Sequence, residues 1–191
     1  MDAGSRIRMR AGILRAAMAT ALAVAVPQVA AAQESWLRND EAYHGKDAAQ
    51  SGKFATLQIA TTEPDQFIVD WQKPGDGVKL VSQDEVKRGR PIVMFIVVRG
   101  CRPDPQGACN VTVDFTTTDP SGKTYNDTKG AEVWVGRPPP PDLAIQLSSG
   151  GLGIAFEQGD PVGAYRVTAR TTDHVAGITL LTEKVLTLLP D

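Results

Sequence analysis

The chain has 191 residues, and its 20 lysines and arginines against 22 aspartates and glutamates give a formal net charge of −2 at pH 7. This mildly acidic balance, with no block of basic residues, lacks the electrostatic footprint of proteins that bind nucleic acid or an anionic membrane surface. Beyond residue 32, no apolar stretch approaches the length that spans a bilayer. We therefore expect no nucleic-acid partner and no membrane span in the mature chain.

Residues 1–32 have the features of a secretory signal peptide. Arginines at positions 6, 8, 10 and 15 precede an apolar run at 16–26, and small residues at 30–32 suit cleavage by a signal peptidase. The run is too short to span a bilayer comfortably, no cysteine follows it for a lipid anchor, and no Arg-Arg pair indicates twin-arginine export. We expect a bacterial protein, periplasmic or secreted, whose mature chain begins near Gln33. Because the segment holds four arginines and one aspartate, its removal leaves 16 basic and 21 acidic residues, a net charge of about −5.

The remaining chain of about 159 residues is long enough for one domain with a hydrophobic core. Its first part is polar and lacks a sustained period, so we expect a mostly irregular N-terminal extension at 33–62 and a single domain at 63–191. Alternating apolar and polar residues predict strands at 67–71, 111–115 and 165–169. The run 91–98 is apolar throughout, which predicts a central strand covered on both faces, or one whose outer face meets a partner or the extension.

Shorter strands are predicted at 57–59, 78–81, 132–135, 143–147 and 153–157, with turn residues between them. In the last strand, 178–189, the inward phase changes near Thr182, which predicts a β-bulge. Residues 82–85 have the spacing of a helical capping box, yet too little follows for more than one turn. Short strands, frequent turns and the lack of an amphipathic helix predict an all-β fold, a Greek-key β-sandwich.

The two cysteines, Cys101 and Cys109, enclose a loop rich in proline and glycine between two predicted strands. In an exported protein such a pair indicates a disulfide that closes the loop and contributes on the order of 2.5 kcal/mol of stability. A zinc site usually needs four ligands in close pairs, and a thioredoxin-type redox site has two residues between its cysteines, where this loop has seven. We interpret the pair as a structural disulfide, with redox and metal roles as the alternatives.

Candidate catalytic residues are few. His174 follows Asp173 in the turn before the last predicted strand, and the spacing does not fix a third member of a hydrolase triad, such as Ser148 or Ser149. Because adjacent residues in a turn seldom face each other, we interpret Asp173 and His174 as a solvated turn and assign no catalytic residue. The other histidine, His44, falls in the extension. Three of the four methionines lie in the signal peptide, which disfavours a copper site.

Two loops share the form Asp-Pro-x-Gly, at 104–107 and 119–122. Oxygen ligands in such loops can hold calcium in extracellular modules, but the same residues suit a type I turn. We interpret both as turns, with calcium as the alternative.

The tetraproline segment Pro138 to Pro141 favours an extended polyproline conformation. We interpret it as a stiff crossover between sheets, with a binding ridge for a partner as the alternative.

Several segments resemble a group of exported bacterial proteins of unestablished function. They are GRPIVMFIVVRGC at 89–101, GAC at 107–109, DPSG at 119–122, Trp134 and GDPVGAY at 159–165. The last segment is also similar to the strand entry of immunoglobulin-like and macroglobulin-like β-sandwich modules. The resemblance covers about residues 65–190. It implies an immunoglobulin-like domain and provides no catalytic residues to transfer.

The sequence therefore predicts a non-enzymatic, exported interaction module without a cofactor. Its expected partner is another envelope protein, and no residue is assigned to catalysis, cofactor binding or metal binding. The alternatives are a small metal-binding periplasmic carrier and a hydrolase that uses loop residues near Asp173 and His174.

Overall fold

The structure, a computed structural model, describes residues 45–73, 82–141 and 144–191. The predicted signal peptide, His44, the strand predicted at 78–81 and the start of the strand predicted at 143–147 lie outside these ranges. The described elements, in chain order, are β1 (Ala48–Ser51), β2 (Phe54–Thr61), α2 (Pro64–Gln72), β3 (Glu85–Val86), β4 (Ile92–Arg99), β5 (Cys109–Thr118), β6 (Thr124–Arg137), β7 (Gln146–Leu147), β8 (Leu152–Ile154), β9 (Gly163–Asp173) and β10 (Ile178–Leu188). The described part of the chain is therefore mostly β, as the sequence predicts.

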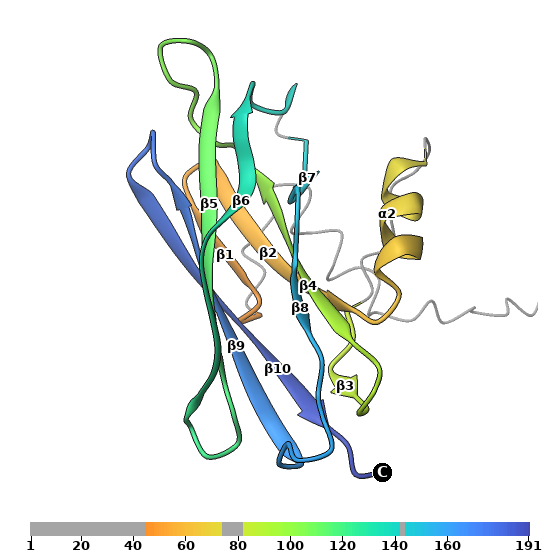
Figure 1. Cartoon of the computed structure of the whole chain (residues 1–191). Coiled ribbons are helices and arrows are strands. Elements are labelled where there is room, and N and C mark those ends of the chain that lie inside the picture. The colour runs from red at the N-terminus through yellow and green to blue at the C-terminus, as the bar shows by residue number, and fades with distance from the viewer. Residues whose placement is uncertain (1–44, 74–81, 142–143) are drawn as a thin grey trace, which may run out of the picture.

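The strands form two sheets (Figure 1). The first sheet has the order β1-β2-β4, and both β7 and β8 pair with β4 on the side away from β2. The second sheet has the order β3-β10-β9-β5-β6. Neighbouring strands are antiparallel, except that β3 and β10 are parallel. The chain changes sheet between β2 and β3, β3 and β4, β4 and β5, β6 and β7, and β8 and β9, so consecutive strands often lie in different layers.

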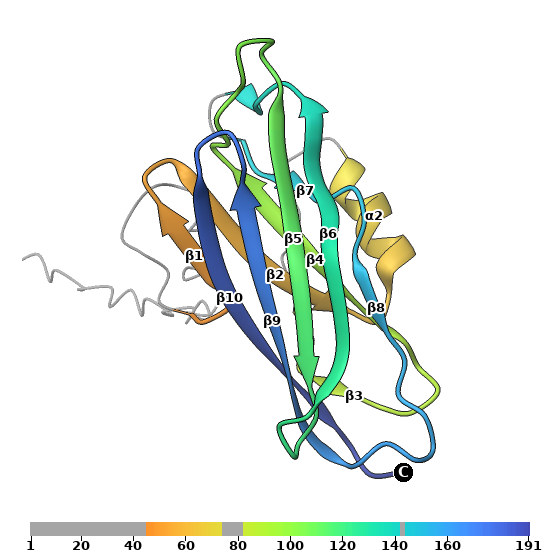
Figure 2. The same ribbon diagram turned by 60° about the vertical axis from the view of Figure 1, so that its left-hand side comes forward.

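The two sheets pack against each other, and the main hydrophobic core lies between them (Figure 2). Alternate residues of the long strands fill this core. They include Ile92, Met94, Ile96 and Val98 of β4, Val111, Val113 and Phe115 of β5, and Tyr165, Val167 and Ala169 of β9. Because the positions between them on β5 and β9 are partly or fully exposed, the period-two strands predicted at 111–115 and 165–169 are confirmed.

Strand β4 is buried on both faces, which confirms the first interpretation of its continuous apolar run. Its even-numbered residues enter the core between the sheets, while Phe95 and Val97 face the opposite side, where α2 covers the first sheet (Figure 2). Phe67 and Trp71 of α2 join this second cluster, and the ring centres of Phe67 and Phe95 are 5.6 Å apart. The strand predicted at 67–71 is therefore wrong. Pro64 suits the first turn of a helix, and residues four apart, such as Phe67 and Trp71, share one helix face.

Strand β10 pairs with β9 without interruption, so the bulge predicted near Thr182 is wrong. The inward phase continues through Thr182 and Lys184, which are both buried. The Thr182 hydroxyl donates to Gln58 Oε1 at 3.1 Å, and the Lys184 ammonium pairs with Asp84. Polar side chains with partners on other elements thus occupy inward positions, whereas Leu181 points outward and is 58% exposed. Register shifts occur instead between β5 and β6.

The β structure begins earlier in the chain than the sequence predicts. Strands β1 and β2 lie inside the range 33–62, and β2 sits between β1 and β4 with Ala55 and Ile59 buried. The expectation of an irregular extension is therefore wrong for 48–61, and the short strand expected at 57–59 is part of β2. Residues 82–85 form no helix, since β3 begins at Glu85 and pairs with β10.

Candidate functional site

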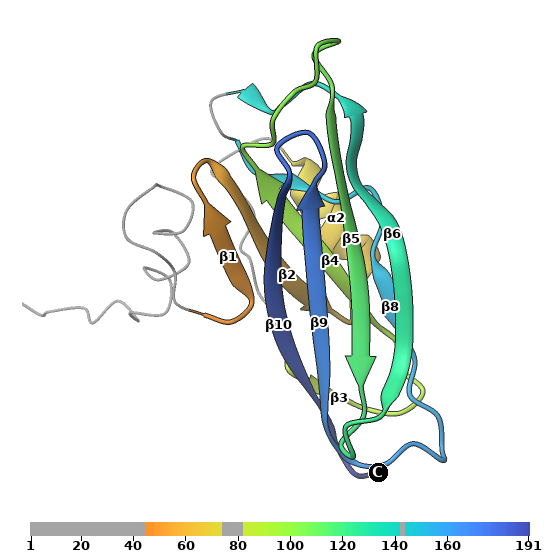
Figure 3. The ribbon, with the colours of Figure 1, turned by 90° about the vertical axis from the view of Figure 1, so that its left-hand side faces the viewer.

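Three connections meet at one end of the molecule. They are the β1–β2 turn at 52–53, the β4–β5 loop at 100–108 and the β9–β10 turn at 174–177 (Figure 3). The β4–β5 loop crosses from the first sheet to the second, so its two ends are anchored in different layers. The β5–β6 turn lies at the opposite end of the molecule. Because loops on a rigid β scaffold often bear the binding residues, this end is the first candidate for a functional site.

A disulfide joins Cys101 to Cys109 across the β4–β5 loop, with Cα atoms 6.1 Å apart. Both cysteines are buried and belong to the core between the sheets. The pairing predicted from the sequence is confirmed, and the described residues contain no free cysteine. The link fixes the loop at the place where the chain changes sheet.

Asp173, the last residue of β9, fastens the β9–β10 turn to the disulfide loop. Its side chain is fully buried, and its carboxylate accepts three backbone N–H groups. The amides of Val175 and Ala176 donate to Oδ1 at 3.0 Å each, and the amide of Arg102 donates to Oδ2 at 2.8 Å. The interpretation of Asp173 as a solvated turn residue is therefore wrong. Every second residue of β9 from Tyr165 onward is buried, and Asp173 falls in the same phase. This alternation was the signal available in the sequence.

His174 faces away from this carboxylate arrangement. It is exposed, its Nε2 shares a hydrogen bond of 2.8 Å with the Thr112 hydroxyl, and its backbone N–H donates to Asn110 O at 3.0 Å. The Ser148 hydroxyl donates to Gly150 O at 2.6 Å. Among the residues that the structure describes, no hydrogen bond joins the carboxylate, the imidazole and a serine into a triad.

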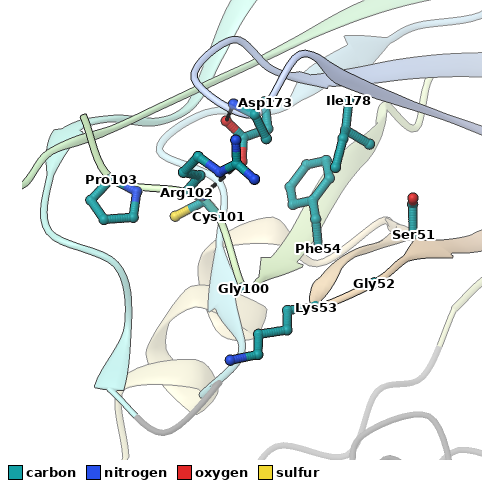
Figure 4. Close-up of a pocket in the computed structure, with 11 residues that line it drawn as sticks. Ser51, Gly52, Lys53, Phe54, Gly100, Cys101, Arg102, Pro103, Asp173 and Ile178 are labelled. Carbon is teal, nitrogen blue, oxygen red and sulfur yellow. Dashed lines mark hydrogen bonds between the residues drawn. The ribbon is translucent and has the colours of Figure 1, made fainter. Parts of the chain in front are cut away.

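A pocket of about 460 Å³ lies between the three connections (Figure 4). Its lining residues are Ser51, Gly52, Lys53, Phe54, Gly100, Cys101, Arg102, Pro103, Asp173, Ala176 and Ile178. Gly100 makes the pocket possible, because its φ is +68° and a Cβ there would lie 2.0 Å from the Lys53 carbonyl oxygen. Only glycine lets the β4–β5 loop lie this close to the β1–β2 turn. We call this recess the loop pocket.

The loop pocket contains two basic side chains and one acidic side chain. Lys53 and Arg102 are exposed, and neither side chain forms an ion pair or hydrogen bond with any residue in the described ranges. The Asp173 carboxylate, by contrast, is committed to three backbone amides. Phe54 and Ile178 add apolar surface. Sequence reasoning missed Lys53 and Arg102, because their proximity depends on how the sheets bring distant turns together.

Both Asp-Pro-x-Gly loops are turns. In each, the glycine N–H donates to the aspartate carbonyl at 2.9 Å, for Gly107 with Asp104 and for Gly122 with Asp119. Each aspartate Oδ1 also accepts backbone N–H groups of its own turn. The hydroxyl of Ser121 donates to Asp119 Oδ1 at 2.7 Å and lowers the pKa of that carboxyl below its ordinary value. Across the described ranges, no group of three or more His, Cys, Asp or Glu side chains is placed to hold a metal ion.

A second, smaller recess of about 320 Å³ lies beside α2. Its aromatic lining comes from Trp71, Phe95 and Trp134, with polar groups from Gln72, Arg137 and Gln146. The Arg137 guanidinium carbon lies 4.9 Å from the centre of the Trp134 ring, and Trp134 Nε1 donates to Pro138 O at 2.9 Å. The prolines from Pro138 onward leave β6 of the second sheet toward β7 of the first, as the crossover interpretation predicts.

The sequence matches no protein-family model and no curated protein. Among solved structures, the chain is similar to a family 123 glycoside hydrolase from Clostridium perfringens, with a TM-score of 0.36 and 10% sequence identity. The match covers 71% of this chain and 27% of that hydrolase. At this TM-score the likeness supports no conclusion about activity. In the described ranges no helix is long and apolar enough to cross a membrane.

Proposed function

We propose that this protein is a non-enzymatic, exported interaction module with an immunoglobulin-like Greek-key fold, and that it binds another envelope protein through the loop pocket. The fold assignment is supported by the parallel pairing of β3 with β10 and by the repeated change of sheet along the chain. It is also supported by Tyr165, near the start of β9, whose hydroxyl donates to Pro161 O at 2.9 Å. A tyrosine that bonds back to the backbone a few residues upstream is typical of immunoglobulin-like domains.

The binding role rests on one observation above the others. Three connections that are far apart in the sequence form a single recess, and two separate contacts hold its walls in place. These contacts are the disulfide and the Asp173 carboxylate bonded to the Arg102 amide, and Gly100 also lies close against the Lys53 carbonyl. A site whose walls are fixed in advance loses less conformational entropy when its partner binds.

The same contacts weigh against a hydrolase. General acid–base work by Asp173 and His174 would need the carboxylate to bond the imidazole, whereas its two oxygens already accept three backbone amides and His174 bonds Thr112 instead. In the two Asp-Pro-x-Gly loops, Oδ1 of Asp104 and Oδ1 of Asp119 likewise already accept backbone amides of their own turns.

Site-specific photo-crosslinking in the producing cells tests this proposal. A photoreactive residue replaces Pro103 in the loop pocket, and a matched residue replaces Lys123 in the β5–β6 turn at the opposite end. We expect position 103 to give one discrete adduct with an envelope protein and position 123 to give none. Equal adducts from both positions, or none from position 103, would show that the loop pocket is not the interaction site.

A further inference from the structure

We propose that the loop pocket binds a carboxylate group of the partner, held between the side chains of Lys53 and Arg102. This inference deepens the proposed function and rests on it, because it names the chemistry that the pocket recognises. The ligand is an acidic side chain or a C-terminal carboxylate, and both present the same planar anion.

The first reason is that these two cations lie in one pocket and have no acidic partner among the described residues, whereas seven other cations do. Ion pairs within 4.0 Å join Lys46 and Arg166 to Glu183, Lys73 to Asp70, Arg88 to Asp191, Arg90 to Glu63, Lys129 to Asp127, and Lys184 to Asp84 and Asp47. Lys53 and Arg102 line one pocket and form none of these pairs. Their charges are therefore available to a ligand.

The second reason is that the acidic residue of the pocket, Asp173, does not pair with Lys53 or Arg102. Asp173 is the one acidic residue of the lining, and both of its carboxylate oxygens accept backbone amides. Its side chain is also fully buried. The lining thus has a net charge of +1, and its exposed charges are both positive.

The third reason is the surface beside the cations. Phe54 and Ile178 line the pocket, and the buried Cys101 closes it (Figure 4). A low-dielectric wall strengthens an ionic hydrogen bond, and the planar guanidinium fork of arginine matches a carboxylate with two parallel bonds. The methylene groups next to a carboxylate can pack on the same apolar wall.

The backbone that bears both cations is fixed before any ligand arrives. The Arg102 amide is bonded to Asp173 at 2.8 Å, and its neighbour Cys101 is held by the disulfide. The backbone of Lys53 lies so close to Gly100 that a Cβ at position 100 would clash with its carbonyl oxygen. The two side chains therefore leave fixed positions on facing loops, as a preorganised anion site requires.

Nuclear magnetic resonance titration of the purified protein tests the inference, with the α-amide of N-acetyl-glutamate as the one-carboxylate probe and the neutral α-amide of N-acetyl-glutamine as its matched control. We expect saturable shifts of the backbone amides at 52–53 and 100–102 with the glutamate probe and none with the glutamine control. Arg102→Gln and Lys53→Gln should each weaken binding about tenfold or more, the loss expected for one charged hydrogen bond. Lys123→Gln, at the opposite end, should leave it unchanged.

Equal shifts with both probes, or equal binding by the Arg102→Gln and Lys123→Gln variants, would overturn the carboxylate site. Tighter binding of inorganic phosphate than of the glutamate probe would overturn the choice of a carboxylate. The crosslink from position 103 separates this inference from the proposed function. An undiminished crosslink in the Lys53→Gln, Arg102→Gln double variant means that the module binds there without a carboxylate, whereas a large loss of crosslink yield in that variant supports the inference.

Discussion

The Asp173 carboxylate accepts the backbone amide of Arg102 at 2.8 Å, and this bond joins the last turn of the second sheet to the disulfide loop. The two residues are 71 positions apart in the sequence. Through this contact, one buried carboxylate holds the β9–β10 turn by its Oδ1 and the β4–β5 loop by its Oδ2. The residue that sequence reasoning considered for catalysis therefore has a structural role at the wall of the loop pocket.

Replacing Asp173 by asparagine tests that role. Asparagine keeps one acceptor oxygen, but its NH2 group cannot accept a hydrogen bond. Because both carboxylate oxygens of Asp173 accept backbone N–H groups, at least one of these donors loses its acceptor. We expect Asp173→Asn to lower the free energy of unfolding by about 2 kcal/mol, within the range for hydrogen bonds to charged groups. Denaturant titration measures this loss.

His174→Ala is the matched control, because His174 is the next residue and its ring is exposed. We expect a loss of about 1 kcal/mol or less from its hydrogen bond to Thr112. If His174→Ala abolished a measurable turnover, the hydrolase would replace the interaction module as the proposed function. His44→Ala, in the part of the chain outside the described residues, should leave fold and binding nearly intact.

The disulfide should be a local stabiliser. We expect the Cys101→Ala, Cys109→Ala double variant to keep its β structure and to lose roughly 2–3 kcal/mol of stability, since the link closes a short loop. The core residues Val111 and Phe115 stay buried without it, because the sheets hold them. Alkylation of the denatured, exported protein checks the pairing, and two free thiols would contradict it.

The hydrogen bonds of Asp119 in the β5–β6 turn predict how the pKa of its carboxyl responds to a substitution. The pKa of Asp119 lies below its ordinary value of about 3.8, and the first cause is the hydroxyl of Ser121. Because the folded-state pKa is lowered, the stabilisation is present above the unfolded-state pKa and is lost as the pH falls through the folded-state pKa. Ser121→Ala should therefore raise the pKa of Asp119, measured by carbon-detected titration.

Asp127 serves as an internal control in the same titration. Its pKa is also lowered, first by Lys129 and then by Thr116, and Ser121 is not among the causes. Its titration should not change in the Ser121→Ala variant. A pKa for Asp119 that is unaffected by the substitution would show that the hydroxyl does not stabilise the carboxylate.

Export is tested by the mass of the mature protein. If residues 1–32 are a cleaved signal peptide, the protein recovered from the periplasm or the medium should begin at or near Gln33. An intact N-terminus in that fraction would contradict the prediction.

The sequence predicts the strands well where one face or both faces are apolar. The residues of β4 are apolar almost throughout because the main core lies on one side of the strand and α2 on the other. The same reasoning failed for Phe67 and Trp71, since five residues fit a period of 2 and a period of 3.6 almost equally. Pro64 and the four-residue spacing were the signals for the helix.

Inward polar residues were the other source of error. Thr182 faces the core because Gln58, 124 positions away, accepts its hydroxyl, and Asp173 faces inward because three amides meet it there. Neither partner can be identified from local sequence. The disulfide, in contrast, was predicted from the spacing of the cysteines and the expectation of export. The loop pocket needs the tertiary arrangement, because Lys53 and Arg102 come from different connections.

Hydrogen–deuterium exchange of the protein, free and bound to its crosslinked envelope partner, tests the central claim most directly. We predict that the partner slows exchange at 51–54, 100–103 and 173–178, the segments that form the loop pocket. Protection confined to 68–72 and 146–149, beside the recess with Trp71 and Trp134, would contradict the claim and place the interaction on the opposite side of the first sheet from the core.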